Sequence, residues 1–306
     1  MGAGRLETED GRTDQLPLVS IILRNYNYGH FLRDAIESVL QQTHPAIEIV
    51  VVDDGSTDGS RNIIEEYGGR IVPVLKENGG QASAWNAGFE ASTGEIICFL
   101  DSDDLFQPDK AAVVVDVFAR HPEAGSCFHA LKLVDAGGVP FARQVRQGIT
   151  GERDFRTIIR KGRLPYIAAA TSALCFRRSL LAELFPTPLI DGDHYIKFAA
   201  LSLAKVYFID AQLALQRIHG DNFYTTKNNP RSKARHFIAT SYWLRKRFPD
   251  LERWIDNMFA AGLANYRRIG GVEQEYQDLV AKYMSGLHPF TRLRIGLWTL
   301  YHRMTE

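Results

Sequence analysis

The sequence predicts an α/β fold in which a mixed sheet is flanked by helices and followed by a helical C-terminal extension. In the first third of the 306 residues, short apolar runs rich in branched residues alternate with helix-like segments, as expected for parallel strands joined by helices. The middle third carries strand-like pieces without a second regular repeat, and from about residue 230 onward the pattern is helical. A parallel sheet gathers its ligands at the carboxyl ends of its strands, so the residues that follow the apolar runs are candidates for a site.

Each element follows from a local pattern. Short apolar runs predict buried strands at 18–23, 47–52, 71–75 and 95–100. Apolar spacing and capping residues predict helices between them, at 31–42, 61–67 and 82–91. The middle third predicts strands at 126–134, 139–145 and 169–176 and a helix at 193–203. Breaks at Pro and Gly divide the last part into helices at 231–248, 251–269, 272–284 and 291–304.

The charge balance argues against nucleic acid as a partner. Lys plus Arg and Asp plus Glu number 36 each, so the chain has no overall positive field that would bind phosphates by counterion release. The length and the 45% hydrophobic content allow a sizeable core without disulfides. Cys98, Cys127 and Cys175 lie far apart in apolar stretches, which predicts buried reduced thiols and fits a reducing cytoplasm.

The sequence contains no segment that we expect to cross a membrane. Residues 1–15 are polar and lack the apolar core of a signal peptide, and no apolar run reaches the roughly 18 to 20 residues that span a bilayer. We therefore expect a cytoplasmic protein whose membrane contact, where it exists, is peripheral on the inner face. The segment 290–304 mixes arginines with large apolar residues, which is typical of interfacial helices but also fits docking onto its own domain or formation of a homo-oligomer.

An acidic turn follows the second apolar run. Its residues are Asp53-Asp54-Gly55-Ser56-Thr57-Asp58, so two carboxylates lie at the carboxyl edge of the predicted sheet, before helix-capping groups. One carboxylate could bind a nucleotide base or ribose, and a capped turn with solvated acids explains the same residues. A receiver-type phosphoacceptor is disfavoured because such proteins carry the acid pair after the first strand.

A second acidic turn, Asp101-Ser102-Asp103-Asp104, follows the fourth apolar run directly. Three carboxylates this close are costly unless a cation neutralises them. Hard oxygen ligands in this number suit Mg²⁺ or Mn²⁺ bridging a diphosphate, with water and phosphate oxygens completing the coordination. A solvated acidic loop would explain an isolated motif of this kind, but the same sheet also carries the first acidic turn, so the two signals point to one site.

The first apolar run is not followed by a glycine-rich phosphate loop. The chain continues with Arg24-Asn25-Tyr26-Asn27-Tyr28-Gly29 in place of a Walker or G-x-G-x-x-G motif. A nucleotidyltransferase, which would open with such a loop, is therefore disfavoured. Phosphates would be held mainly by a metal ion.

Four ordered motifs together resemble family 2 glycosyltransferases, which have the GT-A fold. They are Val19 to Leu23 with Tyr26-Asn27, Asp53 to Asp58, Gly79-Gly80 to Asn86-Ala87-Gly88, and Asp101 to Asp104. The match covers residues 18–109 nearly continuously. The resemblance implies an inverting transferase of cell-surface polysaccharide biosynthesis that uses a divalent metal (Mn²⁺ or Mg²⁺). It further implies a UDP-, GDP- or dTDP-sugar donor, with a UDP-sugar as the leading candidate, and a glycan or lipid-linked acceptor.

The resemblance also implies roles for residues of the first half. The expected metal ligand is Asp103. The expected contacts to the nucleotide and donor sugar are Leu23, Arg24, Tyr26, Asp54, Asn86, Asp101 and Ser102.

Two segments of the second half match the family more loosely. Asp191-Gly192-Asp193 resembles an acidic segment whose second acid is the catalytic base, which implies Asp191. Ile190 and Gly192 depart from the Glu and the aromatic residue of that segment, so Asp193 stays open as the base, and a helix-capping acid is a third explanation. Gln216 to Gly220 resembles a late R-x-H segment that reaches the diphosphate or metal. This implies His219 as a second metal ligand, with a structural histidine as the alternative.

These motifs predict three parts of the chain. They are a disordered leader at 1–15, a GT-A catalytic domain at 16–228 and a helical extension at 229–306. Within the catalytic domain we expect a nucleotide-binding half at 16–109 and an acceptor half at 110–228. A catalytically silent sugar-nucleotide binder is the main rival, which the intact acidic motif disfavours. A membrane-surface scaffold is a second rival that predicts lipid binding without nucleotide affinity.

Overall fold

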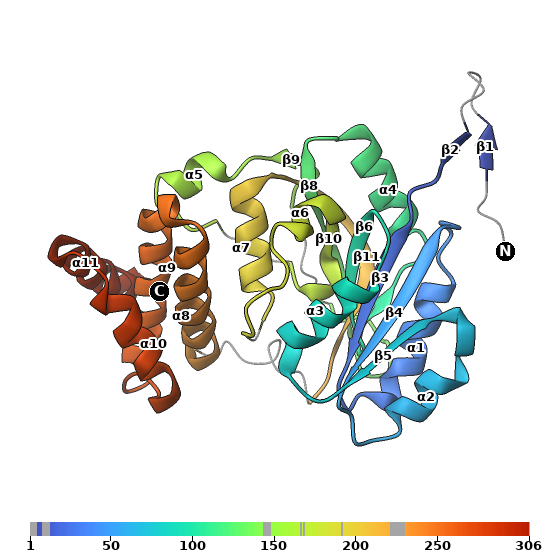
Figure 1. The fold of residues 1–306 in the computed structure, drawn as a ribbon, viewed down its shortest axis with the longest axis horizontal. Helices are drawn as coiled ribbons and strands as arrows, with labels where there is room; N and C mark the ends of the chain where they lie inside the picture. The colour runs from blue at the N-terminus through green and yellow to red at the C-terminus, as the bar shows by residue number, and fades with distance from the viewer. Residues whose placement is uncertain are drawn as a thin grey trace. The chain divides into compact units, whose positions relative to one another are not determined.

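The computed structural model describes residues 5–7, 13–142, 148–165, 167, 169–190, 192–220 and 230–305 (Figure 1). The chain forms two compact units. The sheet unit comprises Met1–Asp154, Ala168–Leu189 and Leu203–His219, and the helical unit comprises Phe155–Ile167, Ile190–Ser202 and Gly220–Glu306. Asp191, the expected catalytic base, lies outside the described residues.

The sheet unit contains a nine-stranded sheet in the order β5-β4-β3-β6-β10-β8-β11-β7, with β9 paired to β11. Strands β3 to β6 are parallel, whereas β10 runs antiparallel to both β6 and β8. This confirms the predicted mixed sheet. The strands are β3 (Val19–Asn25), β4 (Ile47–Asp54), β5 (Val72–Lys76), β6 (Ile96–Asp101), β7 (Leu105–Phe106), β8 (Ala124–Asp135), β9 (Gly151–Arg153), β10 (Leu174–Arg177) and β11 (Lys205–Ile218).

The centre of the sheet is buried on both faces. Consecutive residues of β3 and β4, such as Ile21 and Ile22 or Val50 and Val51, have no exposed surface. A strand covered on both faces reads as a continuous apolar run instead of an alternating pattern. For this reason all four strands expected in the first third are found within two residues of their predicted ends.

Helices cover both faces of the parallel part of the sheet (Figure 1). The chain steps from β3 to β4 to β5 and then returns to β6 on the other side of β3. Right-handed crossovers therefore place α1 and α2 on one face and α3 on the other. The helices of the sheet unit are α1 (Gly29–Leu40), α2 (Ser60–Glu66), α3 (Gly80–Ala91), α4 (Lys110–Arg120) and α6 (Arg178–Ala182).

The middle third differs from its prediction at several places, and the strand predicted at 169–176 is shortened to Leu174–Arg177. The strand expected at 139–145 is not found in its described part, where Asp135 caps a turn by accepting the Val139 amide at 2.8 Å and Pro140 forms an isolated bridge. Conversely, β11 was not expected. Its pairing with β8 is irregular between Ile209 and Ala214, and such a break blurs the period-two pattern by which strands are recognised.

The leader also differs from its prediction. Within residues 1–15, the structure describes β1 (Arg5–Glu7) and β2 (Thr13–Gln15), which pair as an antiparallel two-stranded sheet. These six residues depart from the expectation of a wholly disordered leader.

The helical unit gathers segments from three parts of the chain. Its helices are α5 (Arg156–Arg160), α7 (His194–Leu203), α8 (Pro230–Arg247), α9 (Glu252–Arg268), α10 (Gln274–Ser285) and α11 (Pro289–Thr305). The unit begins at Phe155, earlier than the predicted boundary at 229. Asn257 of α9 donates to the Gly162 carbonyl at 2.8 Å, and α7 packs on α9 with the Phe198 and Trp254 ring centroids 5.8 Å apart. No helix among the described residues is long and apolar enough to cross a membrane.

A buried carboxylate ties four helices of this unit together. Asp256 of α9 has no exposed surface. It accepts hydrogen bonds from Arg245 of α8 at 2.5 Å, Tyr283 of α10 at 2.7 Å and Arg294 of α11 at 2.6 Å. A buried charge with this many donors is satisfied, and removing one member of such a cluster typically costs about 3 to 5 kcal/mol. Asp256 thereby fixes the orientation of α11 within the helical unit.

Candidate active site

Polar residues converge at the carboxyl edge of the parallel strands. In the sheet register, Asn25 of β3 lies beside Asp53 of β4, and Arg24 lies beside Asp101 of β6. The crossover direction reverses between β3 and β6, which is the switch point where open α/β sheets bind ligands. The two acidic turns predicted from sequence are therefore brought together at this edge.

The carboxylate of Asp53 is fully occupied by the protein. It accepts hydrogen bonds from Arg61 Nε at 2.9 Å, Asn25 Nδ2 at 3.1 Å and the Ser56 amide at 3.1 Å. Burial raises the pKa of this acid, but the hydrogen bonds from Ser56, Arg61 and Asn25 outweigh burial, and the net pKa lies below its usual value. Asp53 is therefore an ionised structural anchor of the first acidic turn.

Asp54, an expected nucleotide contact, is also engaged by the protein. Its carboxylate pairs with Lys76 Nζ at 2.6 Å and accepts the amides of Gly79 and Gly80 at 3.0 and 2.8 Å. The side chain thus shapes the glycine turn that begins α3. Gly55 next to it has a φ of +81°, and a Cβ there would lie 2.5 Å from the Asn78 amide nitrogen, so only glycine fits this turn.

The loop after β3 presents Tyr26 to solvent, with 43% of its surface exposed. The loop is held by Asn27, which has a φ of +58° and accepts the Thr57 amide at 2.7 Å. Its own amide donates to Ser56 Oγ at 2.9 Å. Leu23, expected with Tyr26 as a donor contact, has no exposed surface, so its side chain belongs to the core.

The second acidic turn starts at an ion pair. Arg24 Nη2 lies 2.7 Å from Asp101 Oδ1, and the amide of buried Ser102 donates to the Arg24 carbonyl at 3.2 Å. The Asp104 amide closes the turn by donating to the Asp101 carbonyl at 3.0 Å. Arg24, Asp101 and Ser102, three of the expected donor contacts, are thus brought together.

Asp103 and His219 meet although 116 positions separate them. The Asp103 Oδ2 to His219 Nε2 distance is 3.1 Å, and the imidazole packs against the rings of Phe31 and Tyr28 at 4.9 and 5.6 Å. Burial and the charge of Asp101 raise the pKa of Asp103, and His219 opposes this shift. The two residues expected to bind metal therefore lie within reach of one ion.

Asp104 is buried beneath this turn, which the sequence did not show. Ser172 Oγ donates to its carboxylate at 2.6 Å and the Arg217 amide at 3.0 Å. Burial and the charges of Asp103 and Asp101 nevertheless raise the pKa of Asp104 well above its usual value. Ser172 also accepts the Asp101 amide at 3.2 Å, so one hydroxyl supports both ends of the turn.

Lys110 and Arg217 contact residues around the second acidic turn. Lys110 is fully buried and donates to the Ser172 carbonyl at 2.8 Å. Arg217 pairs with Asp34 at 2.7 Å and lies over the Phe31 ring at 4.8 Å. Sequence reasoning missed Ser172 and Lys110, and the only available signal was a polar residue beside an apolar run.

The residues at the turn fit a divalent cation. Asp103 and His219 supply one hard oxygen and one imidazole nitrogen, a donor pair that suits Mn²⁺ and is tolerated by Mg²⁺, and the raised pKa values of Asp103 and Asp104 show a local shortage of positive charge. Among the described residues, no group of three or more His, Cys, Asp or Glu side chains forms a metal cage. Water and substrate oxygens would therefore be needed to complete the coordination.

Asn86, an expected donor contact on α3, is engaged with the main chain of Thr187. Its Nδ2 donates to the Thr187 carbonyl at 3.0 Å, and its Oδ1 accepts the Thr187 amide at 2.7 Å. These bonds attach the loop after α6 to α3. The structure thus gives Asn86 a positioning contact.

In the helical unit, Asp193 is committed to an ion pair. Its Oδ1 lies 2.8 Å from Lys197 Nζ one turn along α7, and both side chains are about nine-tenths buried. The neighbouring His194 ring stacks on His236 at 5.0 Å. Asp193 is thus held by the helix that it precedes, and its role as the base stays a prediction.

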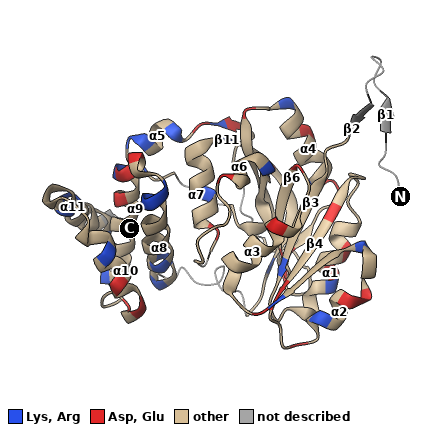
Figure 2. Cartoon of the chain, viewed as in Figure 1, with Lys and Arg blue, Asp and Glu red and all other residues tan. Residues whose placement is uncertain are grey.

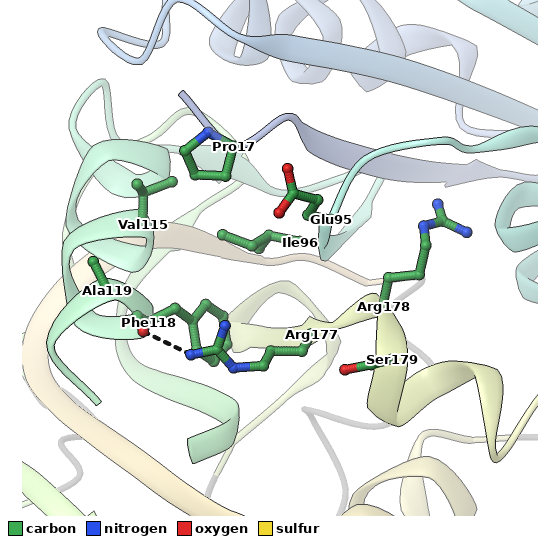
Figure 3. A pocket seen from close by; sticks show the side chains of 9 residues that line it. All are labelled: Pro17, Glu95, Ile96, Val115, Phe118, Ala119, Arg177, Arg178 and Ser179. Atoms are coloured by element: carbon green, nitrogen blue, oxygen red, sulfur yellow. Dashed lines mark hydrogen bonds between the residues drawn. The ribbon is translucent and has the colours of Figure 1, made fainter. Parts of the chain in front are cut away.

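A hollow of about 600 Å³ lies at the other end of the sheet (Figure 3). Its lining includes Pro17 before β3, Glu95 before β6 and Arg177 at the end of β10, so it opens at the amino ends of the parallel strands. Arg177 donates to the Phe118 carbonyl at 2.6 Å and Arg178 to the Gly94 carbonyl at 2.5 Å. These arginines bind helix and loop ends, and the hollow is separate from the acidic turns.

Comparison with known proteins identifies the family. A family model described as glycosyl transferase family 2 matches residues 20–185. An uncharacterised glycosyltransferase of Nostoc sp. is 38% identical over 212 residues, which cover 67% of this chain and 66% of the relative. Bacillus subtilis TuaG, whose name links it to teichuronic acid biosynthesis, is 39% identical over 132 residues, which cover 42% of this chain and 52% of that protein. The match thus spans less than two thirds of each relative.

Solved structures show the same fold. Staphylococcus aureus TarS in complex with UDP-GlcNAc aligns with a TM-score of 0.67 at 18% identity, covering 94% of this chain and 89% of that one. The mannosyltransferase PcManGT of Pyrobaculum calidifontis, in complex with GDP-Man and Mn²⁺, aligns with a TM-score of 0.54 at 20% identity, covering 95% and 88%. With the family model matched over more than half of its length, and with a GT-A fold that carries its acidic turns at the switch point, the chain belongs to glycosyl transferase family 2.

Proposed function

We propose that this protein transfers a sugar from a nucleotide diphosphate sugar, with a UDP-sugar as the leading candidate, to a hydroxyl of a glycan or lipid-linked acceptor with inversion at the anomeric carbon. The observation that carries the proposal is the crowding of Asp101, Asp103 and Asp104 at the sheet's switch point, where His219 joins Asp103. Membership of the family and relatives named for polysaccharide synthesis support it.

Residues of the sheet unit would bind the nucleotide sugar donor. The exposed Tyr26 ring offers a surface on which a base can stack, and the Arg24 to Asp101 pair holds the turn in place beside it. A divalent cation held by Asp103 and His219 would offset the negative charge that develops on the departing diphosphate. The Mn²⁺ bound to the mannosyltransferase supports this assignment.

The acceptor end needs a general base. An acceptor hydroxyl has a pKa far above neutral, so it must lose its proton as the new bond forms. We assign this role to Asp191 by the family pattern. The ion pair between Asp193 and Lys197 supports the choice, because it holds the Asp193 carboxylate against its own helix.

The test of the function is a transfer and hydrolysis assay with a panel of nucleotide sugars, with and without Mn²⁺, preceded by thermal-shift measurements of donor binding. We expect one donor to be turned over with inverted product stereochemistry. Retention would contradict the single displacement. Donor binding without turnover with any acceptor would favour the silent binder, and lipid binding without nucleotide affinity would favour the scaffold.

The base assignment has its own test. Asp191→Asn keeps the shape of the side chain but removes the proton acceptor, so we expect kcat to fall about 10²- to 10⁴-fold with nearly unchanged donor affinity. Asp193→Asn serves as the matched control and should slow turnover far less. A reversal of the two effects would move the base to Asp193, and two active variants would place it elsewhere.

A further inference from the structure

The last helix, α11, presents an apolar stripe to solvent. Six of its large hydrophobic side chains are between 49% and 86% exposed, and they are Phe290, Leu293, Leu297, Leu300, Tyr301 and Met304. Most are spaced alternately by three and four residues, so they lie along one side of the helix. A contiguous exposed apolar surface of this kind marks an interaction site more often than scattered exposed residues do.

The opposite side of α11 is fixed to the helical unit. Ile295 and Thr299 are buried, Arg294 bonds to the buried Asp256 at 2.6 Å, and His302 Nε2 lies 2.7 Å from Asn257 Oδ1 on α9. The buried residues and His302 lie on the side away from the stripe, and Arg294 anchors one edge of it. The stripe therefore cannot turn inward without breaking these contacts. The exposure of the stripe is thus a property of the folded helical unit.

The charge on α11 selects the kind of partner. The helix contains no acidic residue, and its exposed charged side chains are Arg303 and Arg292, which also donates to the Ser285 carbonyl at 2.9 Å. Figure 2 shows several blue Lys and Arg segments on the helices of the helical unit. Large apolar residues flanked by arginines are typical of helices that lie in the interface of an anionic bilayer. A second copy of α11 would instead bring arginines towards arginines with no carboxylate of that helix to pair them.

We propose that α11 docks this protein on an anionic membrane surface, with the helix lying in the plane of the interface. The apolar stripe enters the boundary between headgroups and acyl chains, and Arg292 and Arg303 contact lipid phosphates. The proposal does not depend on the proposed function, because it rests on the surface of the helical unit alone.

The test is flotation of the full chain with vesicles of phosphatidylcholine and phosphatidylglycerol, compared with phosphatidylcholine alone. We expect binding to the anionic vesicles that weakens with added salt. Leu293→Gln combined with Leu297→Gln should lower the partition coefficient roughly tenfold or more, because two apolar side chains no longer enter the interface. Arg292→Gln combined with Arg303→Gln should lower it about fivefold for each arginine removed.

The control is Leu75→Gln combined with Val139→Gln, which changes two exposed apolar side chains of the sheet unit and should leave vesicle binding unaltered. Thermal melting of each variant checks that it is folded, and the arginine pair tests the proposal independently of the leucines. Undiminished binding of both α11 variants, or equal binding to neutral vesicles, would overturn the proposal. So would a wild-type dimer that ignores vesicles and dissociates on the leucine substitutions, since a second copy would then cover the stripe.

Discussion

The Asp53 to Asp58 turn and the Asp101 to Asp104 turn follow strands on either side of β3, yet their carboxylates lie in opposite environments. In the first turn, Arg61, Lys76 and main-chain amides satisfy the acids, and the pKa values of Asp53 and Asp58 lie below the usual value. In the second turn, the acids crowd one another, and burial together with like charge raises the pKa values of Asp103 and Asp104.

This difference shows that an acidic motif does not by itself indicate a ligand site. The first turn has its counter-charges built into the chain and serves to hold the loop that presents Tyr26. The second turn has fewer direct charged partners than carboxylates, because Arg24 pairs with Asp101 and His219 with Asp103 while Asp104 also lies in the turn. A cation supplied with the substrate would offset the remaining negative charge, which is why we propose a metal ion at the second turn.

The largest expected effect tests whether a metal ion offsets the negative charge of the second turn. Asp103→Ala should lower the Mn²⁺-dependent part of UDP affinity roughly 100-fold or more, since even partners beyond the direct ligands typically contribute 10- to 100-fold to metal affinity. Calorimetric titration of UDP with and without Mn²⁺ measures this Mn²⁺-dependent part of the affinity. Asp116→Ala, which removes an exposed acid of α4, is the control, and an unchanged Mn²⁺ dependence in Asp103→Ala would refute the metal assignment.

A smaller effect concerns folding stability in the absence of metal. Asp53→Asn should destabilise the protein by about 1.5 to 3 kcal/mol, because it weakens hydrogen bonds to a charged acceptor. Asp104→Asn should cost less than about 1 kcal/mol or be stabilising, because it relieves repulsion by Asp101 and Asp103. Urea unfolding of both variants gives the comparison. Equal losses would mean that the two turns do not differ in the way described.

The smallest effect is a pH dependence. The folded pKa of Asp53 lies below the usual value of 3.8, so on acidification the unfolded chain takes up its proton first and stability is lost as the pH falls from about 4 through the folded pKa. Asp53→Asn should therefore lose less stability than the wild type between about pH 5 and pH 3. Free energies of unfolding from urea titrations at each pH provide the measurement. If the stability of Asp53→Asn falls with pH in parallel with that of the wild type, the lowered pKa of Asp53 is contradicted.

Much of the sheet unit could be predicted because its signals are local. Continuous apolar runs indicated β3, β4, β5 and β6 within two residues, and the acids that end β4 and β6 indicated the functional edge. The strand β11 was missed because its irregular pairing with β8 breaks the pattern on which the prediction depends. The roles of Asp191 and of the donor contacts stay predictions.

By itself, the sequence determined the parallel strands of the first third, the two acidic turns and the residues available at the sheet edge, since apolar patterns and strand-end motifs are read within short windows. Only the tertiary structure decided which acids are satisfied. Ser172, in the turn before β10, and Arg217 of β11 reach Asp104, and Lys76 of β5 and Gly80 of α3 reach Asp54. The ionisation of a carboxylate depends on its burial and on every charge around it, and these are fixed only when segments far apart in the chain have packed together.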